Sequence, residues 1–187
     1  MILVPNRECG DCTACCKHLT IETTGLVKLP NVTCSHLMES GGCSIYSKRP
    51  TPCREWFCVW RNLSELDDSW RPDKSGVMIE FSDEQFPGIF ANRVGFRFTV
   101  INKEKATRNN KLAKFLKKQI SNGVPCLLSF GIEPAQNPPV TFLNIAMGKA
   151  ANQKNPNGIL GELKKAITAC EQQPKDFLKI EKGRIIY

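Results

Sequence analysis

Cysteine is the residue type whose spacing most constrains the chemistry of this chain. Eight of its ten cysteines lie within the first 58 residues. Thiols at this density are either cross-linked as disulfides or bound to metal, because a thiolate is both a nucleophile and a soft metal ligand. The eight are Cys9, Cys12, Cys15, Cys16, Cys34, Cys43, Cys53 and Cys58.

The amino-terminal residues favour metal over disulfides. Residues 1–8 contain four apolar side chains, whereas a secretory signal needs an apolar stretch of about 7–15 residues. No uncharged apolar run approaches the roughly 18–20 residues of a membrane span. We therefore expect a cytoplasmic protein with no membrane association, in which the thiols stay reduced.

The first four cysteines have a spacing known from iron–sulfur proteins. Cys9-x2-Cys12-x2-Cys15 is the run with which bacterial ferredoxins hold a [4Fe–4S] cluster. The ferredoxin pattern continues with Cys-x3-Cys-Pro, which is missing here because Cys16 follows Cys15 directly. Neighbouring side chains diverge, so Cys15 and Cys16 belong to two sites or one of them bridges.

Zinc fits the same donors. Four cysteines, or three cysteines and a histidine, complete a tetrahedral zinc site. The two histidines, His18 and His36, each lie two residues after a cysteine and are candidate additional ligands. The expected cofactor is therefore an iron–sulfur cluster ([4Fe–4S]) or zinc. The remote Cys126 and Cys170 lie on apolar faces and are predicted to be core thiols.

Two local shapes are predicted around the later cysteines. Gly41-Gly42 favours a tight reversal that brings Cys34 and Cys43 together, because glycine adopts positive φ without penalty. Thr51-Pro52 is typical of a helix start, with Trp56, Trp60 and Leu63 on its apolar face. Cys53 and Cys58 would differ by about 140° on such a helix and would not both face one ion.

The cysteine segment resembles a known family. Its pattern is Cys9-x2-Cys12-x2-Cys15-Cys16, Cys34-x-His36-Leu37, Gly42-Cys43-x-Ile45-Tyr46-x2-Arg49-Pro50-x2-Cys53-Arg54-x-Trp56-x-Cys58-x-Trp60 and Arg71-Pro72-Asp73. This is similar to the cysteine-cluster family of zinc- or iron-chelating domains, also found in a flagellin lysine methylase. Trp56 stands where the family usually has Phe. The resemblance implies metal or iron–sulfur binding by the eight cysteines, without a reaction, and methylase activity is not carried over.

The remainder of the chain predicts an α+β fold. Residues 1–75 form a loop-rich cysteine module, too poor in aliphatic residues to be stable alone. A structural zinc site would add about 10–16 kcal/mol of binding free energy. Residues 76–187 form a basic α+β region packed on the first, with a mixed or antiparallel sheet and two packed helices. The predicted strands are 77–81, 94–101, 126–130 and 140–147, and the predicted helices are 106–120 and 159–170.

Charge is divided unevenly between the halves. Residues 1–99 carry 11 Lys+Arg and 12 Asp+Glu, and residues 100–187 carry 15 and 6. Basic residues among the ligands, such as Arg49 and Arg61, would partly offset thiolate charge. The helix at 106–120 carries Arg108, Lys111, Lys114, Lys117 and Lys118 and no acidic residue.

These patterns favour a metal-chelating protein with an eight-cysteine module and a role in electron transfer, redox sensing or metal sensing for a protein partner. Tyr46, Trp56, Phe57 and Trp60 would shield a cluster from water. The alternative is a structural-zinc interaction module whose basic half binds an acidic partner or nucleic acid. An organic-substrate enzyme is disfavoured, because P-loop, GxGxxG, GxSxG and HExxH motifs are absent.

Overall fold

The computed structural model describes residues 2–152 and 156–187, which form two compact units. The first unit comprises Met1–Lys74, Gly131–Pro138 and Pro174–Tyr187. The second comprises Ser75–Phe130 and Pro139–Gln173. All eight clustered cysteines belong to the first unit, which also takes in two later segments that the sequence did not assign to it.

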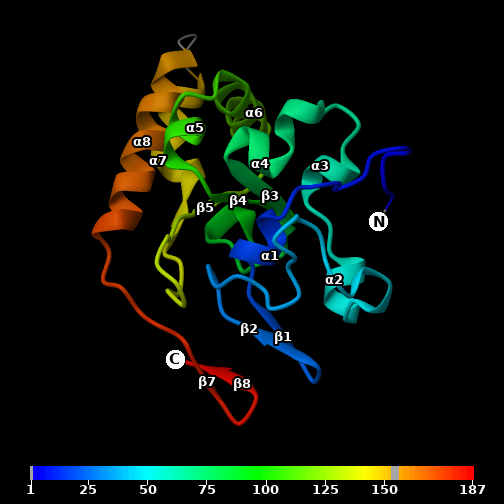
Figure 1. The fold of residues 1–187 in the computed structure, drawn as a ribbon. Helices are drawn as coiled ribbons and strands as arrows, with labels where there is room; N and C mark the ends of the chain where they lie inside the picture. Colours follow the sequence, from blue (N-terminus) through cyan, green and yellow to red (C-terminus); the bar gives the residue numbers. More distant parts are fainter. Residues whose placement is uncertain (1, 153–155) are drawn as a thin grey trace. The chain divides into compact units, whose positions relative to one another are not determined.

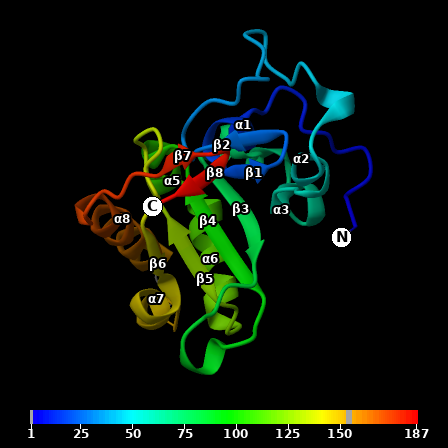
Figure 2. The same cartoon turned by 90° about the horizontal axis from the view of Figure 1, so that it is seen from below.

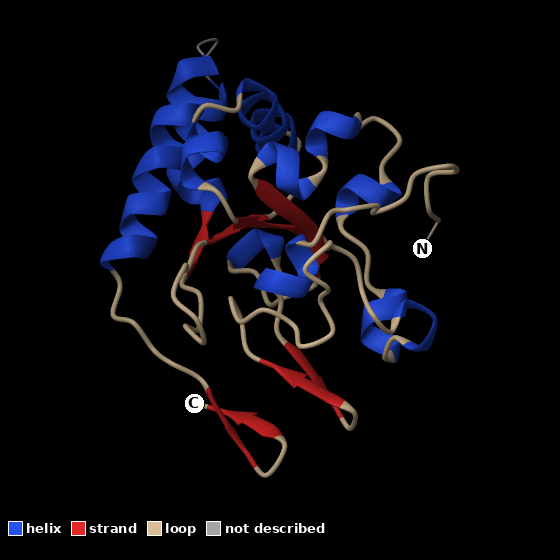
Figure 3. Cartoon of the chain, in the orientation of Figure 1, coloured by secondary structure: helices blue, strands red, loops and turns tan. Residues whose placement is uncertain are grey.

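The first unit consists of loops, short helices and two small hairpins (Figure 3). Its elements are α1 (Ala14–His18), β1 (Ile21–Thr23), β2 (Leu26–Lys28), η1 (Tyr46–Lys48), α2 (Thr51–Glu55), α3 (Val59–Asn62), η2 (Asp68–Trp70), β7 (Lys179–Glu181) and β8 (Arg184–Ile186), with α4 (Pro72–Ser75) at its boundary. The hairpins are antiparallel pairs, β1 with β2 and β7 with β8. No element in the described part of this unit is longer than five residues, so its elements need support from long-range contacts.

The second unit is a four-stranded mixed sheet with helices packed on it (Figures 1 and 2). The elements are β3 (Val77–Ser82), η3 (Gly88–Phe90), β4 (Gly95–Val100), α5 (Lys103–Thr107), α6 (Asn110–Ser121), β5 (Cys126–Ser129), β6 (Val140–Phe142), α7 (Leu143–Asn152) and α8 (Pro156–Gln172). β3 pairs antiparallel with β4, β4 parallel with β5, and β5 antiparallel with β6. The predicted α+β class and mixed sheet are confirmed.

One face of β4 forms the core of this sheet, as its alternating pattern predicts. Phe96, Phe98 and Val100 are all buried. The rings of Phe96 and Phe98 lie 5.6 Å and 6.2 Å from the ring of Phe115 on α6. Helices α6, α7 and α8 pack against one another and against β5, which completes the core.

The predicted helix over 106–120 is two helices. Asn109 has extended backbone angles (φ −85°, ψ 95°), and its side chain accepts a hydrogen bond from the Leu112 N–H. Asn102 caps α5 in the same way through the Lys105 N–H. Because an asparagine at an N-cap stabilises a helix start, Asn109 ends the continuity between α5 and α6.

The predicted strand over 140–147 is wrong beyond Phe142. Strand β6 ends there and α7 begins at Leu143. Leu143, Met147, Ala150 and Ala151 are buried at helical spacing. A short apolar run is compatible with a strand or with a helix. Here the residues form a helix, because its apolar face is buried against the rest of the unit.

The two remote cysteines are core thiols, as predicted. Cys126 is 0% and Cys170 is 1% exposed. Burial raises the pKa of Cys126 to about 12, and it also raises the pKa of Cys170. Both side chains are therefore neutral, inert thiols at ordinary pH.

Asn144 connects α7 to the sheet, and its loss should destabilise the second unit. Its side chain accepts from the Cys126 N–H (2.7 Å) and donates to the Val124 C=O (2.8 Å). Asn144→Ala leaves both groups without a partner. We expect the free energy of unfolding in urea to fall by roughly 2–3 kcal/mol.

The exposed Asn110 on α6 provides the control. Asn110→Ala should change the free energy of unfolding by no more than about 0.5 kcal/mol. An equally small effect of Asn144→Ala would show that the two side-chain bonds contribute nothing to stability.

Candidate metal centre

The eight clustered cysteines are all free thiols, and each sits at a loop or at a short helix. Cys9 and Cys12 lie in the loop before α1, and Cys15 and Cys16 lie within α1. Cys53 lies in α2, and Cys58 occupies the N-cap position of α3. Cys34 and Cys43 flank a chain reversal. Short elements joined by loops let successive thiols turn in different directions, which a long helix would not.

The loop between Cys9 and Cys12 curls tightly. Gly10 has φ +55°, a left-handed conformation that glycine adopts without strain. The turn closes with a hydrogen bond from the Cys12 N–H to the Cys9 C=O at 3.0 Å. The backbone between Cys9 and Cys12 is therefore curled, as the Cys-x2-Cys spacing predicts.

The predicted reversal at Gly41-Gly42 is confirmed. The two glycines have φ of 84° and 81°, and Leu37 forms an antiparallel bridge with Cys43. The Cys34 N–H donates to the Cys16 C=O at 2.9 Å. The reversal is thereby attached to α1 at Cys16.

The predicted continuous helix after Thr51 is wrong. Helix α2 ends at Glu55, Trp56 is extended (φ −84°, ψ 131°), and α3 begins only at Val59. Pro50 rather than Thr51 occupies the N-cap position of α2. Since Cys53 and Cys58 do not share a helix, the 140° offset does not apply to them, and each thiol is directed independently.

The amino-terminal segment is attached to α3. The Val4 N–H donates to the Arg61 C=O at 2.9 Å. The Arg7 guanidinium donates to the Trp60 and Leu63 carbonyl oxygens and lies 5.2 Å from the centre of the Trp60 ring. Arg61 in turn donates from Nη1 to Cys9 Sγ at 3.5 Å. These contacts place Cys9 beside the helix that Cys58 caps.

Different thiols act on Cys58 and on Cys53. Burial raises the pKa of Cys58 to about 12, and the thiols of Cys9 and Cys12 act in the same direction. Burial also raises the pKa of Cys53, together with the thiols of Cys16, Cys34 and Cys43. We name these sets the amino-terminal group (Cys9, Cys12, Cys15, Cys58) and the reversal group (Cys16, Cys34, Cys43, Cys53).

Cys15 and Cys16 stand at the junction of the two groups. A hydrogen bond from the Cys15 thiol lowers the pKa of Cys16 to about 6, and the cations Lys28 and Arg49 favour the Cys16 thiolate further. The same bond raises the pKa of Cys15, to which burial and the charges of Cys16, Cys9 and Cys12 contribute. The hydrogen bond therefore favours the thiolate at Cys16 and the neutral thiol at Cys15.

Lys28 is a buried cation beside the thiols, and sequence reasoning missed it. The residue is 3% exposed, and its Nζ donates to the carbonyl oxygens of Lys17 (3.3 Å), Leu29 (3.2 Å) and Val32 (2.8 Å). Burial lowers the Lys28 pKa, whereas the charges of Cys34, Cys16, Cys15 and Cys53 raise it. The only feature of the sequence that points to a buried Lys28 is its position among apolar neighbours, in Leu26-Val27-Lys28-Leu29-Pro30.

Arg71 organises a second charged contact, at Cys12. It pairs with both carboxylate oxygens of Asp73 at 2.7 Å and with Asp11 at 2.7 Å. Burial raises the pKa of Cys12, and the Asp73 carboxylate raises it further. Arg71 thus holds the loop that carries Cys12 and neutralises the carboxylate beside it.

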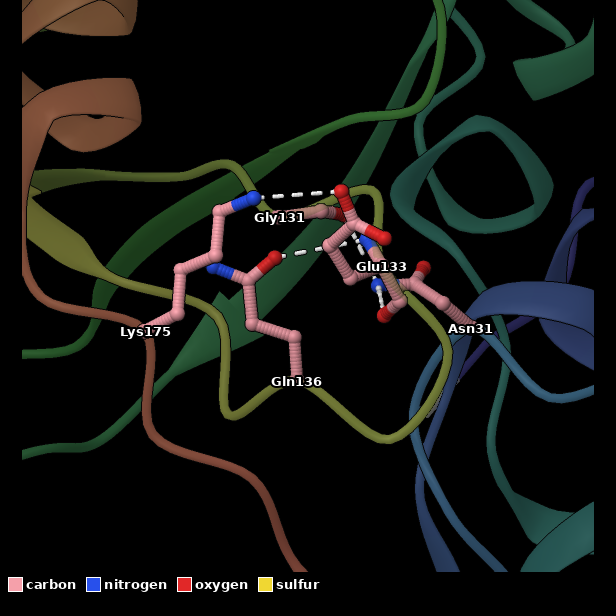
Figure 4. Close-up of polar contacts among 5 residues, drawn as sticks. All are labelled: Asn31, Gly131, Glu133, Gln136 and Lys175. Carbon is pink, nitrogen blue, oxygen red and sulfur yellow. Dashed lines mark hydrogen bonds and ion pairs between the residues drawn. The ribbon is translucent and has the colours of Figure 1, made fainter.

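His18 is fixed by a structural hydrogen bond. Its Nδ1 lies 2.9 Å from Asn31 Oδ1, and Asn31 donates from Nδ2 to the carbonyl oxygens of Gly131 (2.8 Å) and Glu133 (3.4 Å) (Figure 4). Because the amide nitrogen faces carbonyls, Oδ1 is the acceptor and His18 Nδ1 carries the proton. Burial lowers the His18 pKa, and the charges acting on it are those of Lys28 and Lys17.

His36 and the 131–138 segment belong to the same unit as the eight thiols. His36 is half-buried, and its carbonyl oxygen accepts from the Ser44 N–H at 2.9 Å. Glu133 pairs with Lys175 at 3.1 Å, and the Glu133 N–H donates to Gln136 Oε1 at 3.3 Å (Figure 4). In the part of the chain that the structure describes, neither imidazole forms a hydrogen bond to a cysteine sulfur. Both histidines therefore remain candidate ligands only.

The donor set fits a thiolate-bound metal. Free thiols are the ligands that zinc and iron–sulfur clusters take. Beside Cys58, the buried Trp60 Nε1 and Arg61 Nε have no hydrogen-bond partner, and such N–H groups can donate to ligating sulfur. Within residues 2–152 and 156–187, no group of three or more Cys, His, Asp or Glu side chains is placed where it could hold a metal ion. The thiols are gathered, and binding would have to draw them closer.

Comparison with family models, with curated proteins and with solved structures found no match to this chain. The resemblance of the cysteine segment to the cysteine-cluster family thus rests on its motif and stays a prediction. No helix in the described ranges has the length and apolarity needed to cross a bilayer.

Replacing Lys28 should destabilise the first unit. Lys28→Met leaves the three carbonyl oxygens of Lys17, Leu29 and Val32 without their donor. We expect the free energy of unfolding, measured in urea with reductant and chelator, to fall by about 1–3 kcal/mol.

The exposed Lys17 offers a matched control with the same change of charge. Lys17→Met should leave the free energy of unfolding within about 0.5 kcal/mol of the parent chain. A Lys28→Met chain as stable as the parent would contradict a structural role for the buried ammonium.

Proposed function

We propose that this chain is a metal-chelating protein that binds an iron–sulfur cluster or zinc through its eight-cysteine module. The observation that carries the proposal is the gathering of eight free thiols in one unit, with cations beside Cys9 and Cys16. Its role is electron transfer, or redox or metal sensing, for a protein partner. A reducing compartment such as the cytoplasm keeps the thiols available.

The electrostatics of the module support this proposal. Packing eight thiolates together requires positive charge nearby, because buried like charges repel. Arg61 contacts Cys9, and Lys28 and Arg49 act on Cys16. An ordinary core of neutral thiols would need none of these cations.

Aromatic side chains support a dry environment for the metal, with one correction. Trp60 is 5% exposed, and Trp56 and Phe57 are half-buried. Tyr46 is 60% exposed and stacks under Arg49, whose guanidinium carbon lies 3.8 Å from the ring centre. Tyr46 therefore orients a cation instead of covering ligands. The other rings would limit access of water and tune the potential of a bound cluster.

Metal content is the direct test of this proposal. Protein purified without oxygen should contain zinc or iron with sulfide, measured by elemental analysis, and iron–sulfur protein should also show visible charge-transfer absorption and an EPR signal after reduction. Cys12→Ser and Cys53→Ser should each lower the metal content, because each removes a thiolate ligand.

Cys170→Ala serves as the control, since this thiol is a core residue. Its metal content should equal that of the parent chain. Colourless protein that contains only zinc would contradict the iron–sulfur form, and protein that neither retains nor takes up metal would contradict the proposal as a whole.

The alternative function is a structural-zinc module whose basic half binds an acidic partner or nucleic acid. One observation favours it: α6 buries Leu112, Phe115 and Leu116, and it exposes Lys111, Lys114 and Lys118 on its other side. Helix α6 contains no acidic residue. This face would attract phosphates without reading sequence.

Salt dependence tests the alternative. Binding of the full chain to a labelled single-stranded RNA should weaken steeply as salt rises, with log K falling by about 0.7 per neutralised phosphate in each decade of salt. Lys111→Glu with Lys114→Glu should abolish it, whereas Lys164→Glu with Lys165→Glu on α8 should not. Absence of any salt-dependent binding would remove this function.

A further inference from the structure

We infer that the eight thiols form two separate four-thiolate metal sites, the amino-terminal group and the reversal group. This assignment of ligands rests on the proposed function and goes beyond it, because the spacing alone left the division open. Two sets of contacts within the first unit and the position of the Cys15–Cys16 pair carry it.

The first set joins the two ends of the amino-terminal group. Val4 and Arg7 bind the backbone of α3 through the carbonyl oxygens of Arg61, Trp60 and Leu63. Arg61 binds Cys9 Sγ at 3.5 Å, and Cys58 caps the same helix. Cys58, 49 residues after Cys9 in the chain, thereby becomes the distal ligand that the Cys-x2-Cys-x2-Cys run lacks.

The second set joins three members of the reversal group, and the chain leads from them to the fourth. Cys34 is tied to Cys16 by a backbone hydrogen bond of 2.9 Å, and the Leu37–Cys43 bridge folds Cys43 back beside that segment. Cys43 accepts from the Tyr46 N–H at 3.2 Å. The chain then continues through η1 directly into α2, where the Cys53 N–H donates to the Pro50 C=O at 2.9 Å.

The third observation is the junction itself. Cys15 and Cys16 are consecutive residues of α1, so their side chains leave the helix about 100° apart. The two sulfurs share a hydrogen bond, so this pair is the place where the two groups meet. We assign Cys15 to the ion of the amino-terminal group and Cys16 to the ion of the reversal group, with α1 shared by the two sites.

Cations lie beside both groups. Arg61 contacts Cys9 of the amino-terminal group and is stacked over Phe57, with its guanidinium carbon 5.2 Å from the ring centre. Lys28, buried and held by three carbonyl oxygens, interacts with Cys16, Cys34 and Cys53 of the reversal group and also with Cys15. A four-thiolate site keeps net negative charge after binding a divalent ion, and two such sites on one short helix require nearby cations to limit their repulsion.

Protection of cysteines from alkylation tests the division. The full chain is loaded with Zn²⁺, treated with iodoacetamide and mapped by mass spectrometry. In Cys12→Ser, bound zinc should fall by about half, with Cys9, Cys15 and Cys58 alkylated and the reversal group still protected. In Cys53→Ser, Cys16, Cys34 and Cys43 should be alkylated and the amino-terminal group protected.

A chelator titration of the parent chain tests the same division without any substitution. Limiting chelator should expose the cysteines to iodoacetamide in two sets with the membership given above. A single set of eight, or sets with other members, overturns the division while leaving metal binding intact. A parent chain that takes up no Zn²⁺ and protects no cysteine overturns both the division and the proposed function. Cys170→Ala should behave as the parent does.

Discussion

Thiols gathered in a small, loop-rich unit repel one another as soon as they ionise, and burial makes ionisation harder still. The structure answers this constraint with fixed cations. Lys28 is buried and held by three carbonyl oxygens, Arg61 contacts Cys9, and Arg71 neutralises the carboxylates of Asp11 and Asp73 beside Cys12. Because short helices such as α1 and α3 are marginal alone, the same cations that compensate the thiols also tie these elements together.

The two units reach stability by different means. The second has an ordinary core in which Phe96, Phe98 and Phe115 pack between sheet and helix. The first has few large apolar residues, and its long-range order comes from hydrogen bonds such as Val4 to Arg61 and Asn31 to Gly131. In a unit with so small a core, a bound metal would contribute folding free energy directly. Chemistry and stability of the first unit are therefore expected to depend on the same eight sulfurs.

Sequence patterns predicted what depends on local chemistry. The alternation in β4, the glycine reversal before Cys43 and the core positions of Cys126 and Cys170 follow from residues next to one another in the chain. The break between α2 and α3, the helix α7 and the inclusion of 131–138 and 174–187 in the first unit follow from distant partners. Lys28 was missed because an isolated lysine in an apolar run gives no hint of the three carbonyls that accept from it.

X-ray absorption spectroscopy at the edge of the bound metal tests the central claim most directly, because it counts and identifies the atoms that surround the ion. For zinc-loaded protein, we predict that about four sulfur atoms surround the ion at about 2.3 Å, with no nitrogen or oxygen bound to it. A first shell that contains nitrogen or oxygen at about 2.0–2.1 Å would contradict it. Such a shell would assign the metal to histidine, carboxylate or water in place of the two groups of thiols.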